Sequence, residues 1–543
     1  MRISTVFKRT SPLLVFVALF GCAPLASVSP GQIAISPHDT SRDALLDAER
    51  RLSEAQKIAE RQPLLALGDD LAAARLALKQ LSGDPSQLEA RNLYNLAVAR
   101  SIENLERSAI QPWRHPVSVP SPEGAFLLSG APPPNAERDP SNQVLLPADT
   151  IQLAGRLITS RSTAEGIGAP LVAIAQSAVR GHHARFDPEH TYAAETAVIT
   201  FQDHRARIEV FERLSSEQVS IDGHTYPLAA DFTAPLALGM MRERPNRIGV
   251  SALFLPDKYR ERARLIRLQP FDPKRRPVIF VHGLASGPLY WTPMINSLIA
   301  DPEIRRRYQF WVFWYPTGYP FPYSAVQLRH ELDKIKQVFP KSKRAVLIGH
   351  SLGGVVIRLL VTDAGDTIWR ALFGKTPSEM QLPTGTGQLL EETLIFNHRP
   401  DVERAIFITT PHRGTTVASH WWIRMAARVI KQPRSFAEIR TIVNADPAAQ
   451  HLKRIPNCVE TLAPDDPFVL ALNKLPIAPQ IPFHTIEADR GRGDAPNSND
   501  GMVAYWSSHL DGAQSERIIS SNHAAQVHPD GIAEVRRILR SSD

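Results

Sequence analysis

The chain has 543 residues, which is too long for one ordinary hydrophobic core, so two or three domains are expected. Hydrophobic residues make up 43% and charged residues 22% of it, a composition typical of globular proteins. Three cations of the +7 net charge, Arg2, Lys8 and Arg9, lie in a segment expected to be removed, which leaves +4. This small net charge, together with the lack of a basic stripe interleaved with aromatic residues, argues against nucleic-acid binding.

The N-terminus reads as an export signal. Three cations precede an apolar stretch over residues 13–20, which is too short to span a bilayer. The stretch ends at Leu19-Phe20-Gly21-Cys22, which resembles a bacterial lipobox. The resemblance implies that residues 1–21 are removed and that Cys22 is acylated; an ordinary signal peptide with an incidental cysteine is the alternative. An acylated Cys22 predicts a lipid-anchored protein of the cell envelope, on the periplasmic face of a bacterial outer membrane.

Two regions are expected between the signal and the C-terminal half. Residues 22–112 show helical periodicity interrupted at Gly68 and Gly83, which predicts about three helices in a small bundle. Residues 113–270 begin with a proline-rich crossing and continue as a mixed, β-biased domain and linker, with strands expected over 197–201 and 206–211.

From residue 271 to 543 the pattern changes to alternating strands and helices. Short apolar runs suited to buried parallel strands lie between helical stretches, and such alternation predicts a doubly wound, mostly parallel sheet. The runs occupy residues 278–281, 310–314, 345–348, 405–408 and 483–486.

The motif Gly349-His350-Ser351-Leu352-Gly353 stands directly after the strand at 345–348 and directly before a helical run. This context predicts a nucleophile elbow, in which a strained serine is held out above the sheet at a helix N-terminus. A structural turn is the alternative. Two further motifs accompany it: Val281-His282-Gly283-Leu284 follows the first strand, and Thr409-Thr410-Pro411-His412-Arg413-Gly414 follows the fourth.

Together these motifs resemble the lipase and esterase branch of the α/β-hydrolase superfamily, particularly bacterial lipoprotein hydrolases related to GPI inositol-deacylase-like lipases. The resemblance spans about residues 275–540 and does not cover the N-terminal 250 residues. It implies an α/β-hydrolase fold and an oxyanion hole formed by the backbone N–H groups of Leu284 and Leu352. His282 is expected to be structural and not a proton shuttle.

The acid and the base should follow the serine in that chain order. Asp500, in the turn Asn499-Asp500-Gly501, is the predicted acid, with Asp494 and Asp511 as rivals. A calcium loop built on Asp489, Asp494 and Asp500 matches no known spacing, and no metal or cofactor is expected.

For the base, His523 follows the last predicted strand and precedes the last helix, where this fold presents its histidine. His528 is expected to cap or pack at the helix start, and His509 precedes the strand. The three residues Ser351, Asp500 and His523 predict acyl transfer through an acyl-enzyme.

The expected activity is hydrolysis of carboxylic esters, of acyl lipids in particular. The same triad serves acyltransferases, thioesterases and amidases, and a hydrolase fold can also act as a non-catalytic envelope scaffold. An insertion over about 413–480 is expected to form a cap; its Trp421-Trp422-Ile423 segment reads equally well as an amphipathic lid or as an ordinary packed helix. Cys458 is expected to be a buried apolar residue.

Overall fold

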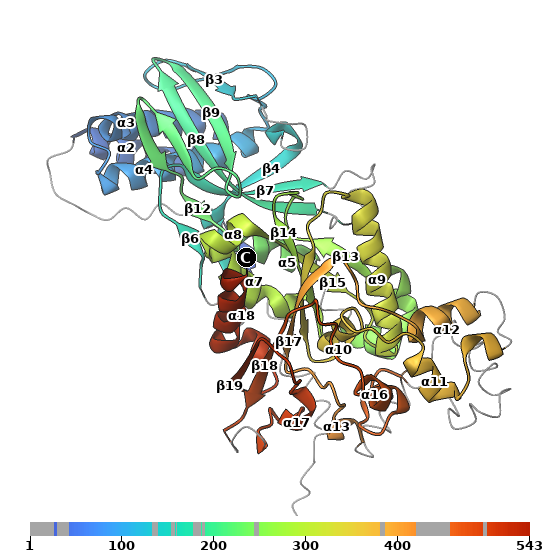
Figure 1. The fold of residues 1–543 in the computed structure, drawn as a ribbon. Helices are drawn as coiled ribbons and strands as arrows, with labels where there is room; N and C mark the ends of the chain where they lie inside the picture. The colour runs from blue at the N-terminus through green and yellow to red at the C-terminus, as the bar shows by residue number, and fades with distance from the viewer. Residues whose placement is uncertain are drawn as a thin grey trace, which may run out of the picture.

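A computed structural model shows two units joined at a narrow junction (Figure 1). It describes residues 26–29, 43–132, 139–153, 158, 160–176, 186, 190–243, 249–380, 386–419, 430, 457–491 and 497–542. The predictions for the signal peptide, Cys22, Asp494 and the Trp421-Trp422 segment lie outside these residues. Of the helices described, none has the length and hydropathy needed to cross a membrane.

The N-terminal unit opens with the three expected helices, α2 (Asp43–Ile58), α3 (Pro63–Gly83) and α4 (Leu88–Ser108). Pro63 starts α3, because proline at the first helical turn costs no hydrogen bond, and an extended Asp84 ends it. The three helices pack on one another and on one face of a sheet through buried leucine and alanine side chains. The hydroxyl of Tyr94 on α4 both donates to and accepts from the backbone of Ile199 in that sheet, at 2.8 and 2.9 Å.

That sheet has six strands in the order β2-β3-β9-β8-β7-β4, and only β3 and β9 pair in parallel. Its strands are β2 (Val117–Val119), β3 (Phe126–Gly130), β4 (Gln143–Pro147), β7 (Ala169–Gln176), β8 (His190–Gln202) and β9 (Arg205–Glu212). The two strands expected from the sequence lie within β8 and β9. Smaller strand pairs are β1 (Ala26–Val28) with β5 (Ile151–Leu153), β6 (Thr163–Ala164) with β12 (Ala230–Asp231), and β10 (Gln218–Ile221) with β11 (His224–Pro227).

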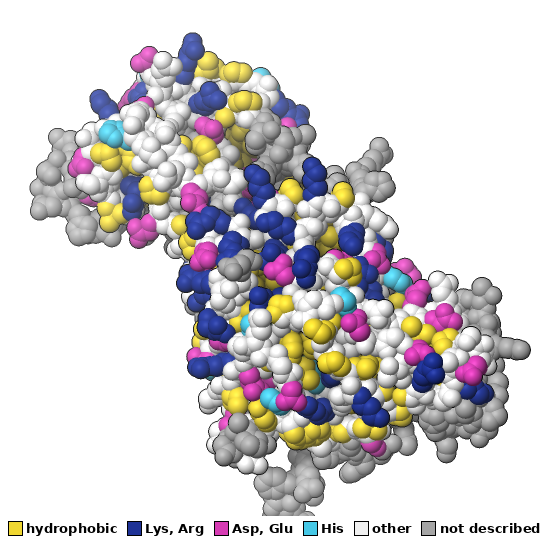
Figure 2. Space-filling view, viewed as in Figure 1, with side chains coloured by type: hydrophobic (Ala, Val, Ile, Leu, Met, Phe, Trp, Pro, Cys, Tyr) yellow, Lys and Arg dark blue, Asp and Glu magenta, His cyan; other side chains and the backbone are white. Residues whose placement is uncertain are grey.

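The junction contains α5 (Thr233–Glu243), α6 (Gly249–Phe254) and the 3₁₀ turn η6 (Pro256–Arg262). Lys and Arg side chains gather on the visible surface around it (Figure 2).

The C-terminal unit is built on a seven-stranded sheet in the order β13-β15-β14-β16-β17-β18-β19, in which only β13 is antiparallel to its neighbour. Its strands are β13 (Arg264–Arg267), β14 (Arg276–Val281), β15 (Tyr308–Trp314), β16 (Ala345–His350), β17 (Val402–Ile408), β18 (Phe483–Asp489) and β19 (Ser515–Ser520). The sheet therefore starts at Arg264, earlier than the boundary predicted at residue 271. An edge strand needs little apolar surface, so β13 can carry charged residues, and its sequence resembles that of a linker.

Helices cover both faces of this sheet (Figure 1). Along β14, Val278 and Phe280 join one apolar cluster while Ile279 and Val281 join the other, as expected for a strand buried on both sides. One face carries α7 (Thr292–Ala300), α8 (Pro302–Arg307) and α18 (Pro529–Ser541); the other carries α9 (Phe321–Val338), α10 (Leu352–Arg358), α11 (Thr367–Phe373), α12 (Thr386–Leu394) and α16 (Pro467–Leu472). This is the α/β-hydrolase fold, and the predicted fold class is confirmed.

Candidate active site

Ser351 lies at the sharp turn between β16 and α10, with φ 54° and ψ −124°, a conformation that non-glycine residues seldom adopt. The turn is possible because its glycines have no side chains. A Cβ on Gly353 would lie 2.2 Å from the carbonyl oxygen of Val281, and one on Gly354 would lie 1.9 Å from Thr410 Oγ1. Strand, turn and neighbouring loops therefore approach closely enough to hold the serine hydroxyl above the sheet.

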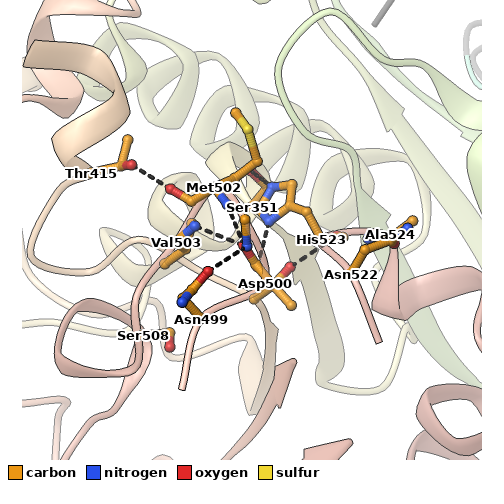
Figure 3. A network of polar contacts seen from close by, with 12 residues as sticks. Ser351, Thr415, Asn499, Asp500, Met502, Val503, Ser508, Asn522, His523 and Ala524 are labelled. Carbon is orange, nitrogen blue, oxygen red and sulfur yellow. Dashed lines mark hydrogen bonds and ion pairs between the residues drawn. The ribbon is translucent and has the colours of Figure 1, made fainter. Parts of the chain in front are cut away.

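The structure brings Ser351, His523 and Asp500 together, although they come from three separate loops (Figure 3). Nε2 of His523 lies 2.8 Å from Ser351 Oγ, and its Nδ1 lies 2.6 Å from Asp500 Oδ2. Asp500 is only 3% exposed, and its other oxygen accepts the N–H groups of Met502 and Val503, both at 2.7 Å. These two donors fix the orientation of the carboxylate toward the imidazole.

The rival residues have other partners. Asp511 is exposed and contacts His509 Nε2 at 3.1 Å, while Nδ1 of His509 contacts Glu516 at 2.8 Å. Burial lowers the pKa of His509, but hydrogen bonds to these two carboxylates outweigh it and the pKa is raised. His528 accepts the N–H of Asp530 and caps α18, as expected. None of these side chains contacts Ser351 among the hydrogen bonds of the described residues.

The loop after β14 passes directly beside the serine. A Cβ on Gly283 would lie 3.1 Å from Ser351 Cβ. The N–H groups of Leu284 and Leu352 have no backbone partner within the described part of the chain, and Leu352 is the first residue of α10, where helix N–H groups are free. An oxyanion hole requires two N–H donors without backbone partners, and these two belong to segments that adjoin Ser351.

His282 is buried and stacks on Tyr315 with ring centroids 4.6 Å apart. Its Nδ1 donates to the carbonyl oxygen of Gly283 at 3.0 Å, and burial lowers its pKa to about 4. A buried, neutral imidazole bonded to its own loop supports the expectation that His282 is structural.

The Thr-Pro-His turn after β17 lies against α10, the helix that follows Ser351. His412 is 1% exposed and meets the edge of the Phe407 ring, and burial holds its pKa well below the ordinary value. Its carbonyl oxygen accepts from the buried guanidinium of Arg358 on α10, which also donates to the carbonyl oxygens of Leu472 and Leu475. Arg358 thus joins α10, the turn and the end of α16.

His350 lies inside the elbow motif, and the sequence alone indicates no role for it. Its Nε2 lies 2.8 Å from the backbone carbonyl oxygen of His523, so it donates there and fixes the backbone of the histidine that faces Ser351. Burial is the largest cause that lowers its pKa, to about 3, so the ring is neutral throughout the pH range of ordinary assays. The motif itself carries no signal for this contact, because the partner lies 173 residues away.

Replacing His350 with alanine is expected to lower kcat by about 10- to 100-fold, because a displaced His523 no longer aligns with Ser351. Glutamine can donate from a similar place and should recover part of the loss. Steady-state kinetics of both variants, normalised to titrated active sites, measure this. Equal losses in both would contradict a role for the donated hydrogen bond.

A second buried carboxyl, that of Glu487, lies near Asp500. Glu487 on β18 is 3% exposed, and one of its oxygens has no hydrogen-bond partner among the described residues. Burial is the main cause that raises its pKa to about 8; the charges of Glu516 and Asp500 add to the shift, and Ser508 opposes it. The Glu487 side chain is therefore protonated at neutral pH.

Glutamine at position 487 is expected to change how stability depends on pH. The unfolded wild-type chain loses this proton near the ordinary glutamate pKa, whereas the folded chain keeps it to about 8, so wild-type stability falls between about pH 5 and 8. Glu487→Gln should lack this decline and gain on the order of 1 kcal/mol or more over wild type across that window. Thermal unfolding at pH 5 and 8 measures it; Glu391→Gln, at an exposed position, should show no such trend.

A cavity of about 540 Å³ lies between the two units and not at the serine. Its wall includes Tyr192, Phe232, Ile295 and Trp314, and neither Ser351 nor His523. Within the described ranges no group of three or more His, Cys, Asp or Glu side chains is arranged to hold a metal ion.

Comparison with known proteins gives a family match for the C-terminal half. Residues 278–535, a little under half of the chain, match the "Alpha/beta hydrolase family". No curated protein matches the sequence. Similar solved structures include a mature lipase of Bacillus licheniformis, with 17% identity over 51% of this chain and 97% of that one at a TM-score of 0.31. A metagenomic carboxyl esterase shares 11% identity over 50% of this chain and 76% of that one, at a TM-score of 0.29.

Proposed function

We propose that this chain is a serine hydrolase that cleaves carboxylic esters through an acyl-enzyme. The observation that carries the proposal is the continuous relay of Asp500, His523 and Ser351, with contacts of 2.6 and 2.8 Å, at a strained strand-to-helix turn. The family match of residues 278–535 and the two free N–H groups beside the serine support it.

In the proposed reaction His523 Nε2 takes the proton of Ser351 as Oγ attacks the ester carbonyl. The N–H groups of Leu284 and Leu352 stabilise the oxyanion, and Asp500 stabilises the imidazolium. His523 then protonates the leaving alkoxide, the alcohol departs, and the serine carries the acyl group. Water loses a proton to the same histidine as it attacks the acyl-enzyme, and His523 returns that proton to Ser351 Oγ as the acid departs.

The substrate that we propose is an apolar acyl ester of the cell envelope, which an anchor at Cys22 would keep near lipid. The His-Gly loop, the elbow and the Thr-Pro-His turn support a likeness to GPI inositol-deacylase-like lipases within the superfamily. Transfer of the acyl group to another acceptor would use the same triad. Thioester or amide hydrolysis and a silent scaffold are the other outcomes that the experiment distinguishes.

The test has two steps. A fluorophosphonate probe should label the wild-type chain and not Ser351→Ala; an unlabelled wild-type chain would favour the scaffold. A panel of esters, thioesters and amides of graded acyl length on the chain from Ala23 onward should then show a preference for longer acyl esters. Equal rates for all acyl lengths would exclude the lipid substrate.

A further inference from the structure

The segment of residues 249–259, here called the α6 segment, precedes both the hydrolase sheet and the region of the family match, yet it packs on the active site. Leu253 is 9% exposed and forms an apolar cluster with Cys458 and Ile430. The side chains of Leu284 and Ala285, in the loop that passes beside Ser351, pack on this cluster together with Phe254 and Val459.

The backbone of the α6 segment also lies unusually close to the loops of the site. A Cβ on Gly318, in the loop after β15, would lie 2.2 Å from the carbonyl oxygen of Leu253. A Cβ on Gly249 would lie 3.0 Å from the carbonyl oxygen of Ser286. Glycine at both positions lets the segment rest directly on these two loops.

Polar contacts hold the segment in place. Tyr319, fully buried, donates its hydroxyl to Asp257 at 2.9 Å, and Ser251 bonds the hydroxyl of Tyr259 at 2.9 Å. The ring of Tyr259 meets Trp314, at the end of β15, edge-on with ring centroids 6.4 Å apart. The segment is thus attached to the hydrolase sheet by side chains that lie outside the catalytic relay.

The loop that it contacts is fixed at its start, where the hydroxyl of Tyr315 donates to the carbonyl oxygen of His282 at 2.8 Å. Residues 282–286, here called the oxyanion loop, have no helix or strand after Val281, and Ala285 adopts a positive φ of 53°. The N–H of Ala285 donates to Thr317 Oγ1 at 3.1 Å. Gly283 meets Ser351 on one side of the loop, and Leu284 and Ala285 meet the α6 segment cluster on the other.

We infer that the α6 segment is a positioning element of the active site: it holds the oxyanion loop against Ser351 so that the N–H of Leu284 faces the reacting carbonyl. The inference rests on the proposed function. It assigns part of the N-terminal region a role in the reaction, through residues that lie outside the relay of Asp500, His523 and Ser351. Such an element acts on the transition state and not on substrate binding, since the oxyanion forms only during attack.

The test compares Leu253→Ala with Leu238→Ala. Leu238 is equally apolar and fully buried, but it lies on α5 in a cluster of the N-terminal unit that does not include the oxyanion loop. Both variants lose similar core packing. The kcat values are normalised to the concentration of active sites titrated with fluorophosphonate. The inhibition constant of an alkylboronic acid measures the oxyanion hole, because its adduct with the serine is tetrahedral.

Leu253→Ala is expected to lower kcat about tenfold or more while KM stays within twofold of wild type. Binding of the boronic acid should weaken by the same factor as kcat. Leu253→Met should recover most of this loss, and Leu238→Ala should lower the melting temperature while kcat per titrated site stays at the wild-type value. The inference is overturned if Leu253→Ala keeps wild-type kcat per site, or if Leu238→Ala loses as much. A wild-type chain that neither reacts with fluorophosphonate nor cleaves esters would instead refute the proposed function.

Discussion

Alanine at position 351 is expected to lower kcat for ester hydrolysis by about a millionfold, to the level that binding and the oxyanion hole alone provide. The reason is that Ser351 Oγ is the only hydroxyl in hydrogen-bond contact with His523 Nε2 among the described residues. Steady-state hydrolysis of the best ester in the panel measures the loss, with fluorophosphonate labelling as an independent readout.

A matched control is available in Ser324 on α9, whose buried hydroxyl has no partner in the described part of the chain. Ser324→Ala should keep wild-type kcat. Unfolding temperatures show whether a loss of activity comes from the missing hydroxyl or from a less stable fold. Ser351→Gly should unfold at a higher temperature than Ser351→Ala, because glycine adopts φ 54° and ψ −124° without strain. If Ser351→Ala retained more than a small fraction of wild-type activity, another nucleophile would have to be sought.

Much of this site could be predicted from the sequence because its requirements are local. An elbow needs a strand, two small residues around the serine and a helix, all within about fifteen residues, and the structure has this order in β16, Ser351 and α10. His523 could be predicted from its place after the last strand and before the last helix, since each parallel strand delivers the following loop to the same edge of the sheet. The sequence does not separate Asp494, Asp500 and Asp511 as clearly, because all three carboxylates follow the same strand in polar loops.

The contacts that hold the site in place could not be predicted, because they join segments far apart in the chain. His350 bonds a backbone carbonyl, which every residue has, so no sequence pattern identifies its partner. The α6 segment contacts the oxyanion loop through ordinary apolar residues and two glycines, a composition that also fits a linker. Charged β13 lies at the sheet edge, and it belongs to the sheet because it pairs with β15, from Arg264 with Trp314 to Arg267 with Trp311, far ahead in the chain.

Asparagine at position 500 is expected to lower kcat by about 10⁴ while the site keeps its shape. In the wild-type chain one oxygen of Asp500 accepts two backbone N–H groups and the other accepts Nδ1–H of His523. The asparagine must keep its carbonyl oxygen on the two N–H donors, which turns its amide NH₂ toward Nδ1. His523 then carries its proton on Nε2, where it faces Ser351 Oγ and cannot accept the serine proton.

Asp511→Asn is the matched control, because that carboxylate also contacts a histidine, His509, but is exposed. It should leave kcat within twofold of wild type, since a solvent-exposed pair contributes little and lies outside the relay. The comparison measures kcat and KM for both variants with the same ester. KM should stay near wild type in both variants, because the carboxylate acts on the imidazolium that forms during attack. A large loss of kcat in Asp511→Asn together with a small loss in Asp500→Asn would instead identify Asp511 as the acid.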